Sequence, residues 1–201
     1  MGRSTFKSEL SSRPAANGET SEQYVVADQW SNARIVVLAG DVTEHSIATV
    51  IVQLLHLASL NHKPITLVVS TYGGSVDEMF GLYDTIKFLP CPVHTVALGK
   101  VMSAGVLLLA AGTKGKRLIG SSARLMIHPV SGGAHGNVFE VMNETNEHKR
   151  IHDLMVEMLK RETKMSAEQI ENVMKSGHDV YVTPVEAVAF GIVDRVVGEK
   201  S

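Results

Sequence analysis

The sequence has very little cysteine, few aromatic residues and no excess of charge of either sign. Only one of the 201 residues is cysteine (Cys91), so no disulfide can form within the chain. A lone cysteine is typical of proteins in a reducing compartment. We therefore expect a cytoplasmic location, with an organelle matrix or stroma as the alternatives.

The low net charge and the absence of long apolar runs exclude further classes. The formal net charge is -2 and no lysine or arginine cluster is present, so we expect no nucleic-acid partner. No apolar run approaches the roughly 20 residues that span a bilayer, so we expect no membrane partner. The composition, 44% hydrophobic and 20% charged, is that of a globular protein, and the length favours one domain.

The first part of the chain differs from the rest. Residues 1–23 are rich in serine, glutamate, glycine and asparagine, show no apolar period and lack the apolar core of a signal peptide. We predict a flexible N-terminal arm or propeptide over 1–23 and a single folded domain over 24–201.

Apolar residues predict alternating strands and helices in the first half of that domain. Short β-branched runs predict buried strands, and apolar residues three and four apart predict helices. In chain order, the expected elements are a strand at 35–38, a helix at 47–58, a strand at 65–69, a helix at 76–86 and a strand at 93–98. Such alternation indicates parallel βαβ units and an α/β fold.

The second half continues the pattern. We expect a short helix from Ser103, strands near Leu118 and Leu125, a long helix at 138–161 and a last strand at 192–197. Capping boxes at 166–169 and 183–186 each predict the start of a helix.

Three residues could form a nucleophilic site. Ser103 lies between a predicted strand and an apolar helix, His128 follows a predicted strand, and Asp179 precedes the last capped helix. A serine becomes a nucleophile when a base accepts its proton. Each residue alone has an ordinary alternative: a helix N-cap for Ser103, a structural histidine for His128 and a turn former for Asp179.

Several segments, taken together, resemble the proteolytic subunit of the Clp protease (ClpP) from about residue 24 to 197. They are 34–40 (RIVVLAG), 73–76 (GGSV), 103–105 (SAG), 108–117 (LLAAGTKGKR), 124–129 (RLMIHP), 132–136 (GGAHG) and 184–194 (PVEAVAFGIVD). The resemblance implies a crotonase/ClpP-like α/β fold of βαβ units, with a strand–helix handle protruding from about 132–161.

The resemblance also implies a serine endopeptidase without metal or organic cofactor. By position, Ser103 matches the nucleophile, His128 the base and Asp179 the carboxylate that orients the base. Asp179 matches only if two residues are inserted after Gln169.

Four other positions match residues that contact the substrate in the family. Gly74 and Ala104 correspond to the backbone N–H donors of the oxyanion hole, and Gly132 and Gly133 to an extended segment that pairs with substrate. The family usually has methionine where this chain has Ala104, and proline where it has Tyr72.

Family resemblance further implies a homo-oligomer of two stacked heptameric rings that cleaves peptides and unfolded proteins delivered by an ATP-dependent Clp unfoldase. Thr66 and Val68 stand where many members have aromatic residues that help dock the unfoldase, so we expect altered docking. Met155 and Met158 on the long helix are interpreted as an inter-ring surface.

Two alternatives stay open from the sequence. The chain could be a catalytically weak or inactive ClpP-like ring subunit, which Ala104 and the displaced Asp179 favour. It could also be an acyl-CoA enzyme of the same superfold, because fold alone does not determine function.

Overall fold

The computed structural model describes residues 33–199. The N-terminal arm predicted for 1–23 lies outside the described residues, as do 24–32 at the start of the predicted domain. Within the described part, no helix has both the length and the apolar character needed to cross a membrane.

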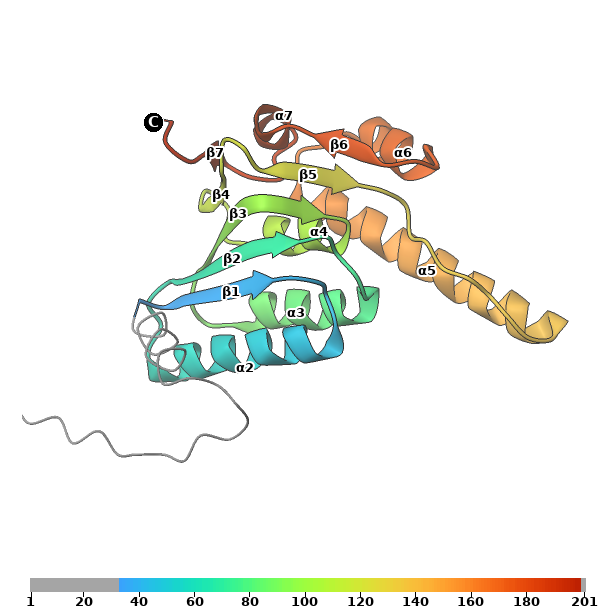
Figure 1. Ribbon diagram of the computed structural model, residues 1–201, viewed down its shortest axis with the longest axis horizontal. Helices are drawn as coiled ribbons and strands as arrows, with labels where there is room; N and C mark the ends of the chain where they lie inside the picture. Colours follow the sequence, from blue (N-terminus) through green and yellow to red (C-terminus); the bar gives the residue numbers. More distant parts are fainter. Residues whose placement is uncertain (1–32, 200–201) are drawn as a thin grey trace, which may run out of the picture.

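Strands and helices alternate along most of the described chain (Figure 1). The strands are β1 (Ile35–Ala39), β2 (Ile65–Thr71), β3 (Val93–Met102), β4 (Arg117–Ile119), β5 (Arg124–Ile127), β6 (Val180–Val182) and β7 (Arg195–Val196). The helices are α2 (Glu44–Leu60), α3 (Val76–Phe88), α4 (Ala104–Ala110), α5 (Val138–Glu162), α6 (Ala167–Lys175) and α7 (Pro184–Ala189).

The strands form one mostly parallel sheet. Its main order is β1-β2-β3-β4-β7, and β5 pairs with the far end of β3. All of these pairs are parallel, whereas β6 adds to β5 as an antiparallel edge strand. The α/β fold class predicted from the alternating pattern is therefore confirmed, with one antiparallel strand in addition.

The core lies between the sheet and the helices α2, α3 and α4, which cover one face of it (Figure 1). Along β2, residues alternate between buried and half-buried, as expected for a strand with one face in the core. The opposite face remains partly open: Val37 of β1 and Leu98 of β3 are 43% and 45% exposed. The half-buried Thr66 and Val68 lie on this open face.

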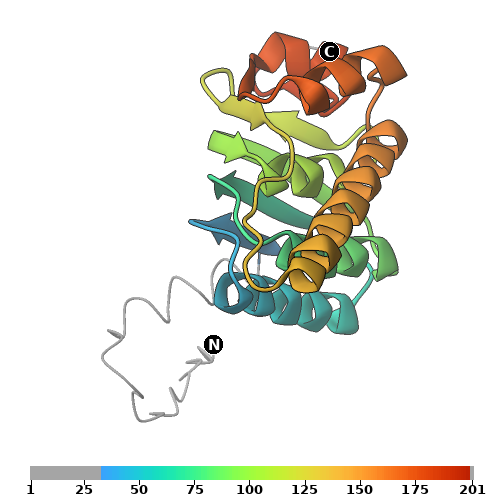
Figure 2. The ribbon, with the colours of Figure 1, turned by 90° about the vertical axis from the view of Figure 1, so that its right-hand side faces the viewer.

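Helix α5 extends well beyond the sheet as a protruding arm, and the segment from β5 to α5 runs alongside it (Figures 1 and 2). The helix begins with a capping box in which the Asn137 side chain accepts hydrogen bonds from the N–H groups of Phe139 and Glu140. Val138 and Phe139, in this first turn, are 72% and 78% exposed. The protruding handle expected from the family resemblance is thus present.

A buried carboxylate anchors the other end of α5. Glu162 is 3% exposed and accepts a hydrogen bond from the Tyr83 hydroxyl of α3. Its oxygens also lie 2.9 Å from Lys87 Nζ and 3.1 Å from Lys114 Nζ. Burial raises the pKa of Glu162, but the hydrogen bonds from Tyr83, Lys87 and Lys114 outweigh it and hold the pKa below its ordinary value. Burial and the bond to Glu162 raise the pKa of Tyr83 to about 12, so the phenol stays protonated and donates.

Two details differ from the sequence predictions. Strand β6 was not expected, because its three residues are too few to show a period, and β7 covers only two residues of the strand predicted at 192–197. The interpretation of Met155 and Met158 as an inter-ring surface is wrong. Both side chains pack into the core of the chain, at 6% and 2% exposure, because that stripe of α5 faces the body of the domain.

Candidate active site

Ser103 occupies a strained corner between β3 and α4. Its φ of 53° and ψ of -125° lie in a region that residues with a side chain rarely adopt. The Ser103 N–H donates to the Met126 carbonyl oxygen at 2.8 Å, which fixes this corner to β5. Ser103 is the N-cap residue of α4, but its side chain makes no capping hydrogen bond, so capping does not account for the position of its hydroxyl.

The small residues after the serine allow α4 to pack closely against the sheet. All seven residues of α4 are buried. A Cβ atom on Gly105 would lie 2.5 Å from the Thr71 Cγ2 of β2, closer than any real contact. Glycine at this position therefore sets the height of the helix start over the strands, and with it the position of Ser103.

The Ser103 hydroxyl is in contact with the imidazole of His128. Ser103 Oγ and His128 Nε2 are 2.8 Å apart. The contact follows from topology: β3 and β5 are parallel neighbours with Met102 opposite Met126, so the residues after the two strands meet at one edge of the sheet. With the proton on Nδ1, the imidazole accepts a hydrogen bond from the hydroxyl and is placed to take its proton.

Asp179 lies next to this pair without bonding to it. Val180 is opposite Ile127 in the β5–β6 register, so the next position along places Asp179 opposite His128. The Asp179 side chain is exposed, and within residues 33–199 it forms no hydrogen bond or ion pair. The structure thus joins two of the three predicted residues and puts the third at the adjacent position.

The Gly73–Gly74 turn is packed tightly against the serine. A Cβ atom on Gly73 would lie 2.7 Å from the Ser103 Cβ, and one on Gly74 would lie 2.3 Å from the Val42 carbonyl oxygen. Both glycines have positive φ, 100° and 146°, so a side chain would be strained there as well as blocked. Gly73, which was not among the predicted site residues, is therefore packed closely against Ser103 as well.

The N–H groups of Ala104 and Gly74 are the predicted donors of the oxyanion hole. Ala104 is the first residue of α4, and its N–H precedes the first hydrogen bond of the helix. In the part of the chain that the structure describes, neither the Ala104 N–H nor the Gly74 N–H donates to another backbone group. Both predicted oxyanion donors therefore have a free hydrogen.

Gly132 and Gly133 lie in the exposed segment that links β5 to α5. No backbone hydrogen bond joins residues 129–136 to another backbone group within 33–199. A Cβ atom on Gly132 would lie 2.8 Å from the His148 imidazole, so this segment packs closely on α5. The His135 N–H of this segment donates to the Glu144 carboxylate at 3.1 Å. The backbone groups around Gly132 and Gly133 form no such bond within 33–199 and could pair with an extended peptide.

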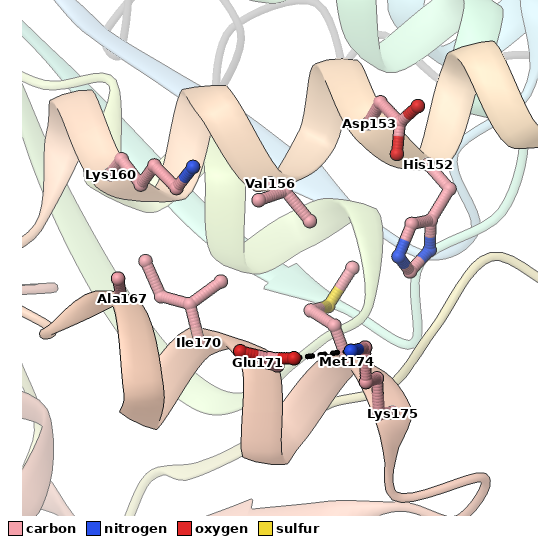
Figure 3. Close-up of a pocket in the computed structure, with 9 residues that line it drawn as sticks. All are labelled: His152, Asp153, Val156, Lys160, Ala167, Ile170, Glu171, Met174 and Lys175. Atoms are coloured by element: carbon pink, nitrogen blue, oxygen red, sulfur yellow. Dashed lines mark hydrogen bonds and ion pairs between the residues drawn. The ribbon is translucent and has the colours of Figure 1, made fainter.

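A groove of about 270 Å³ separates α5 from α6. Figure 3 shows Val156 from α5 and Ile170 and Met174 from α6 pointing toward one another across it, with Lys160 and Lys175 at its rim. No residue predicted for the site lines this groove, and no group of three or more possible metal ligands occurs among the described residues.

The fold is that of a mixed α/β protein, and Ser103 and His128 form the nucleophile–base pair that a hydrolytic site requires. The sequence matches the family described as Clp protease over residues 17–200. This match covers nearly the whole chain, so the protein belongs to the Clp protease family and is a serine peptidase of the ClpP type. Membership in this family makes the acyl-CoA alternative the weaker one.

Proposed function

We propose that the chain is a serine endopeptidase subunit with Ser103 as nucleophile, His128 as general base and Asp179 as the residue that orients His128. The observation that carries this proposal is the 2.8 Å contact between Ser103 Oγ and His128 Nε2, made by a strained serine whose side chain makes no capping hydrogen bond. Strain at a single polar residue is typical of a functional position.

In the proposed reaction, the Ser103 oxygen attacks the scissile carbonyl carbon while His128 takes the hydroxyl proton. The N–H groups of Gly74 and Ala104 would stabilise the oxyanion of the tetrahedral intermediate. His128 then gives the proton to the leaving amine, and an acyl-serine remains. Water, deprotonated by His128, hydrolyses this ester and restores the serine.

Substrate would bind as an added strand along residues 129–136, including Gly132 and Gly133. Recognition through backbone hydrogen bonds depends little on side chains, which suits an enzyme that degrades many unfolded proteins. We propose that an ATP-dependent Clp unfoldase supplies these substrates in the cytoplasm. Thr66 and Val68, half-buried on the open sheet face, offer no aromatic area, so docking of the unfoldase would be altered.

We propose that the subunit assembles into two stacked heptameric rings with the sites inside. Two exposed apolar surfaces support assembly: the start of α5, with Val138, Phe139 and Met142, and the open sheet face, with Val37 and Leu98. Contiguous exposed apolar surface on a folded chain indicates a contact with another protein.

A second candidate function is a structural ring subunit with weak or no catalysis. The specific observation in its favour is Asp179, whose carboxylate does not bond to His128. Without that bond, the imidazole is less well oriented and the imidazolium is less stabilised.

The test is labelling of the assembled protein with a fluorophosphonate probe, together with hydrolysis of a short fluorogenic peptide. Labelling of the wild type and no labelling of Ser103→Ala would identify an activated serine. Asp179→Asn separates the two candidates: a loss of hydrolysis of about a thousandfold or more supports the triad. Assembled wild-type rings that neither label nor cleave would support the structural subunit.

A further inference from the structure

Two cations, Lys100 and Arg124, stand side by side near the candidate site. Lys100 of β3 and Arg124 of β5 are register partners in the parallel pair of strands. Their neighbours Val101 and Leu125 are fully buried, so Lys100 and Arg124 both point to the face of the sheet away from the core. Within residues 33–199, neither forms a salt bridge, although like charges directly opposite each other destabilise a sheet.

Each cation is held by the ring of an exposed tyrosine. Lys100 Nζ lies 4.6 Å from the centre of the Tyr72 ring, and Arg124 Cζ lies 5.3 Å from that of Tyr181. Tyr72 and Tyr181 are 62% and 55% exposed. The four side chains come from the end of β2, which Tyr72 directly follows, and from β3, β5 and β6, with the two cations flanked by a tyrosine on each side. Cation–π contacts restrict the two charged groups while leaving them open to an anion.

This row adjoins the candidate catalytic residues. Tyr72 directly precedes Gly73, which packs against Ser103. Arg124 begins β5 and His128 directly follows it, and continuing the alternation along β5 by one residue places both on the same face. Four residues of strand span roughly 13 Å, the length of about four residues of an extended peptide.

We propose that Lys100 and Arg124 bind a carboxylate side chain of the substrate, so that the enzyme prefers peptides with an acidic residue three or four positions from the scissile bond. This inference rests on the proposed peptidase function and names a substrate class for it. A carboxylate between the two cations removes their mutual repulsion, and the Arg124 guanidinium can donate two parallel hydrogen bonds to it. Within residues 33–199, no carboxylate pairs with either cation, and Glu186, in the helix that follows β6, accepts hydrogen bonds from Thr183.

The test uses pairs of internally quenched peptides that differ only in glutamate or glutamine at each position from two to five residues on either side of the cleavage site. For the wild type at low salt, we expect kcat/KM to be about five- to tenfold higher for the glutamate peptide at one of these positions. The preference should fall with added salt because exposed charges are screened.

The double variant Lys100→Gln, Arg124→Gln should lose the preference, so that its kcat/KM is the same for the glutamate and the glutamine peptide. The matched control is Lys63→Gln, which removes an exposed cation just before the other end of β2. This variant should keep the preference for glutamate. Cleavage of both peptides at equal rates by the wild type would overturn this inference and leave the proposed peptidase intact. Cleavage of neither peptide would count against the peptidase itself. Loss of assembly in the double variant would overturn the inference in favour of a contact between copies of the chain.

Discussion

The two ends of α5 differ in whether their side chains have partners within the described part of the chain. At the C-terminal end, the Glu162 carboxylate is buried and bonded to Tyr83 and Lys87 of α3 and to Lys114 of the turn before β4. At the N-terminal end, Val138, Phe139 and Met142 are between 57% and 78% exposed. One end of the helix is completed by the chain's own core, and the other has no apolar partner in the part of the chain described.

This contrast indicates that the two ends of the helix have different roles. A buried ion pair requires a well-defined geometry, so the Glu162 cluster fixes the direction in which α5 leaves the domain. Exposed apolar residues at the far end cost solubility unless another protein covers them. The anchored end therefore positions the exposed apolar surface that we propose for assembly.

The largest effect is expected from removing the anchor. Glu162→Ala leaves the buried Tyr83 hydroxyl without its acceptor and the nearby lysines without a counter-charge. We expect the free energy of unfolding to fall by about 3 kcal/mol, as measured by denaturant titration. Glu157→Gln breaks an exposed ion pair with Lys160 and should leave the free energy of unfolding nearly unchanged. Equal effects of the two substitutions would contradict the anchoring role.

The next largest effect is expected at the exposed end. The double variant Phe139→Ser, Met142→Ser should fold as the wild type does, because neither side chain is in the core. Its assembly should need at least about a tenfold higher protein concentration in sedimentation experiments, since two apolar contacts per subunit are lost. Val185→Ser, at a similarly exposed position of α7, is the control. A double variant that assembles normally but unfolds more easily would reverse the assignment of the two ends.

A smaller, local effect is expected from the N-cap. Asn137→Ala removes the side chain that accepts hydrogen bonds from the N–H groups of Phe139 and Glu140. The first turn should lose about 1 kcal/mol of local stability, which lowers hydrogen-exchange protection there about fivefold. Asn143→Ala, on the exposed surface of the same helix, should not change protection in the first turn.

The smallest effect is a difference in acid sensitivity. The pKa of Glu162 is lowered below its ordinary value of 4.5 in the folded chain, so its contribution to stability is fully present above about pH 4.5. That contribution is lost as the pH falls through the lower, folded pKa. Acid unfolding of Glu162→Gln should therefore depend less steeply on pH below 4.5 than that of the wild type. Identical slopes would show that Glu162 is not preferentially ionised in the folded state.

Much of the fold could be predicted because its elements are long and periodic. The helix predicted at 138–161 is α5, and the capping boxes at 166–169 and 183–186 begin α6 and α7. Strand β6 could not be predicted, since three residues between a loop and a capped helix carry no period of their own. It exists because β5 offers it an edge to pair with.

The candidate site, too, has residues that the sequence could predict and contacts that it could not. Ser103 and His128 could be named from flanking motifs that are local in sequence, and the structure brings them into contact. The place of Asp179 depends on the pairing of β6, and the contact of Gly73 with Ser103 depends on how the turn after β2 meets α4. Met155 and Met158 show the limit of a helical stripe, which predicts an apolar face but not what covers it.

The sequence by itself determined the α/β pattern, the helix starts and the family, because apolar periods, capping residues and motifs act over a few residues. Only the tertiary structure decided that Ser103 bonds to His128, that Glu162 is buried among cations, and that Lys100 stands beside Arg124. Each of these depends on which strands and helices become neighbours. Strand order and helix packing result from burying all apolar faces at once, so no short stretch of sequence specifies them.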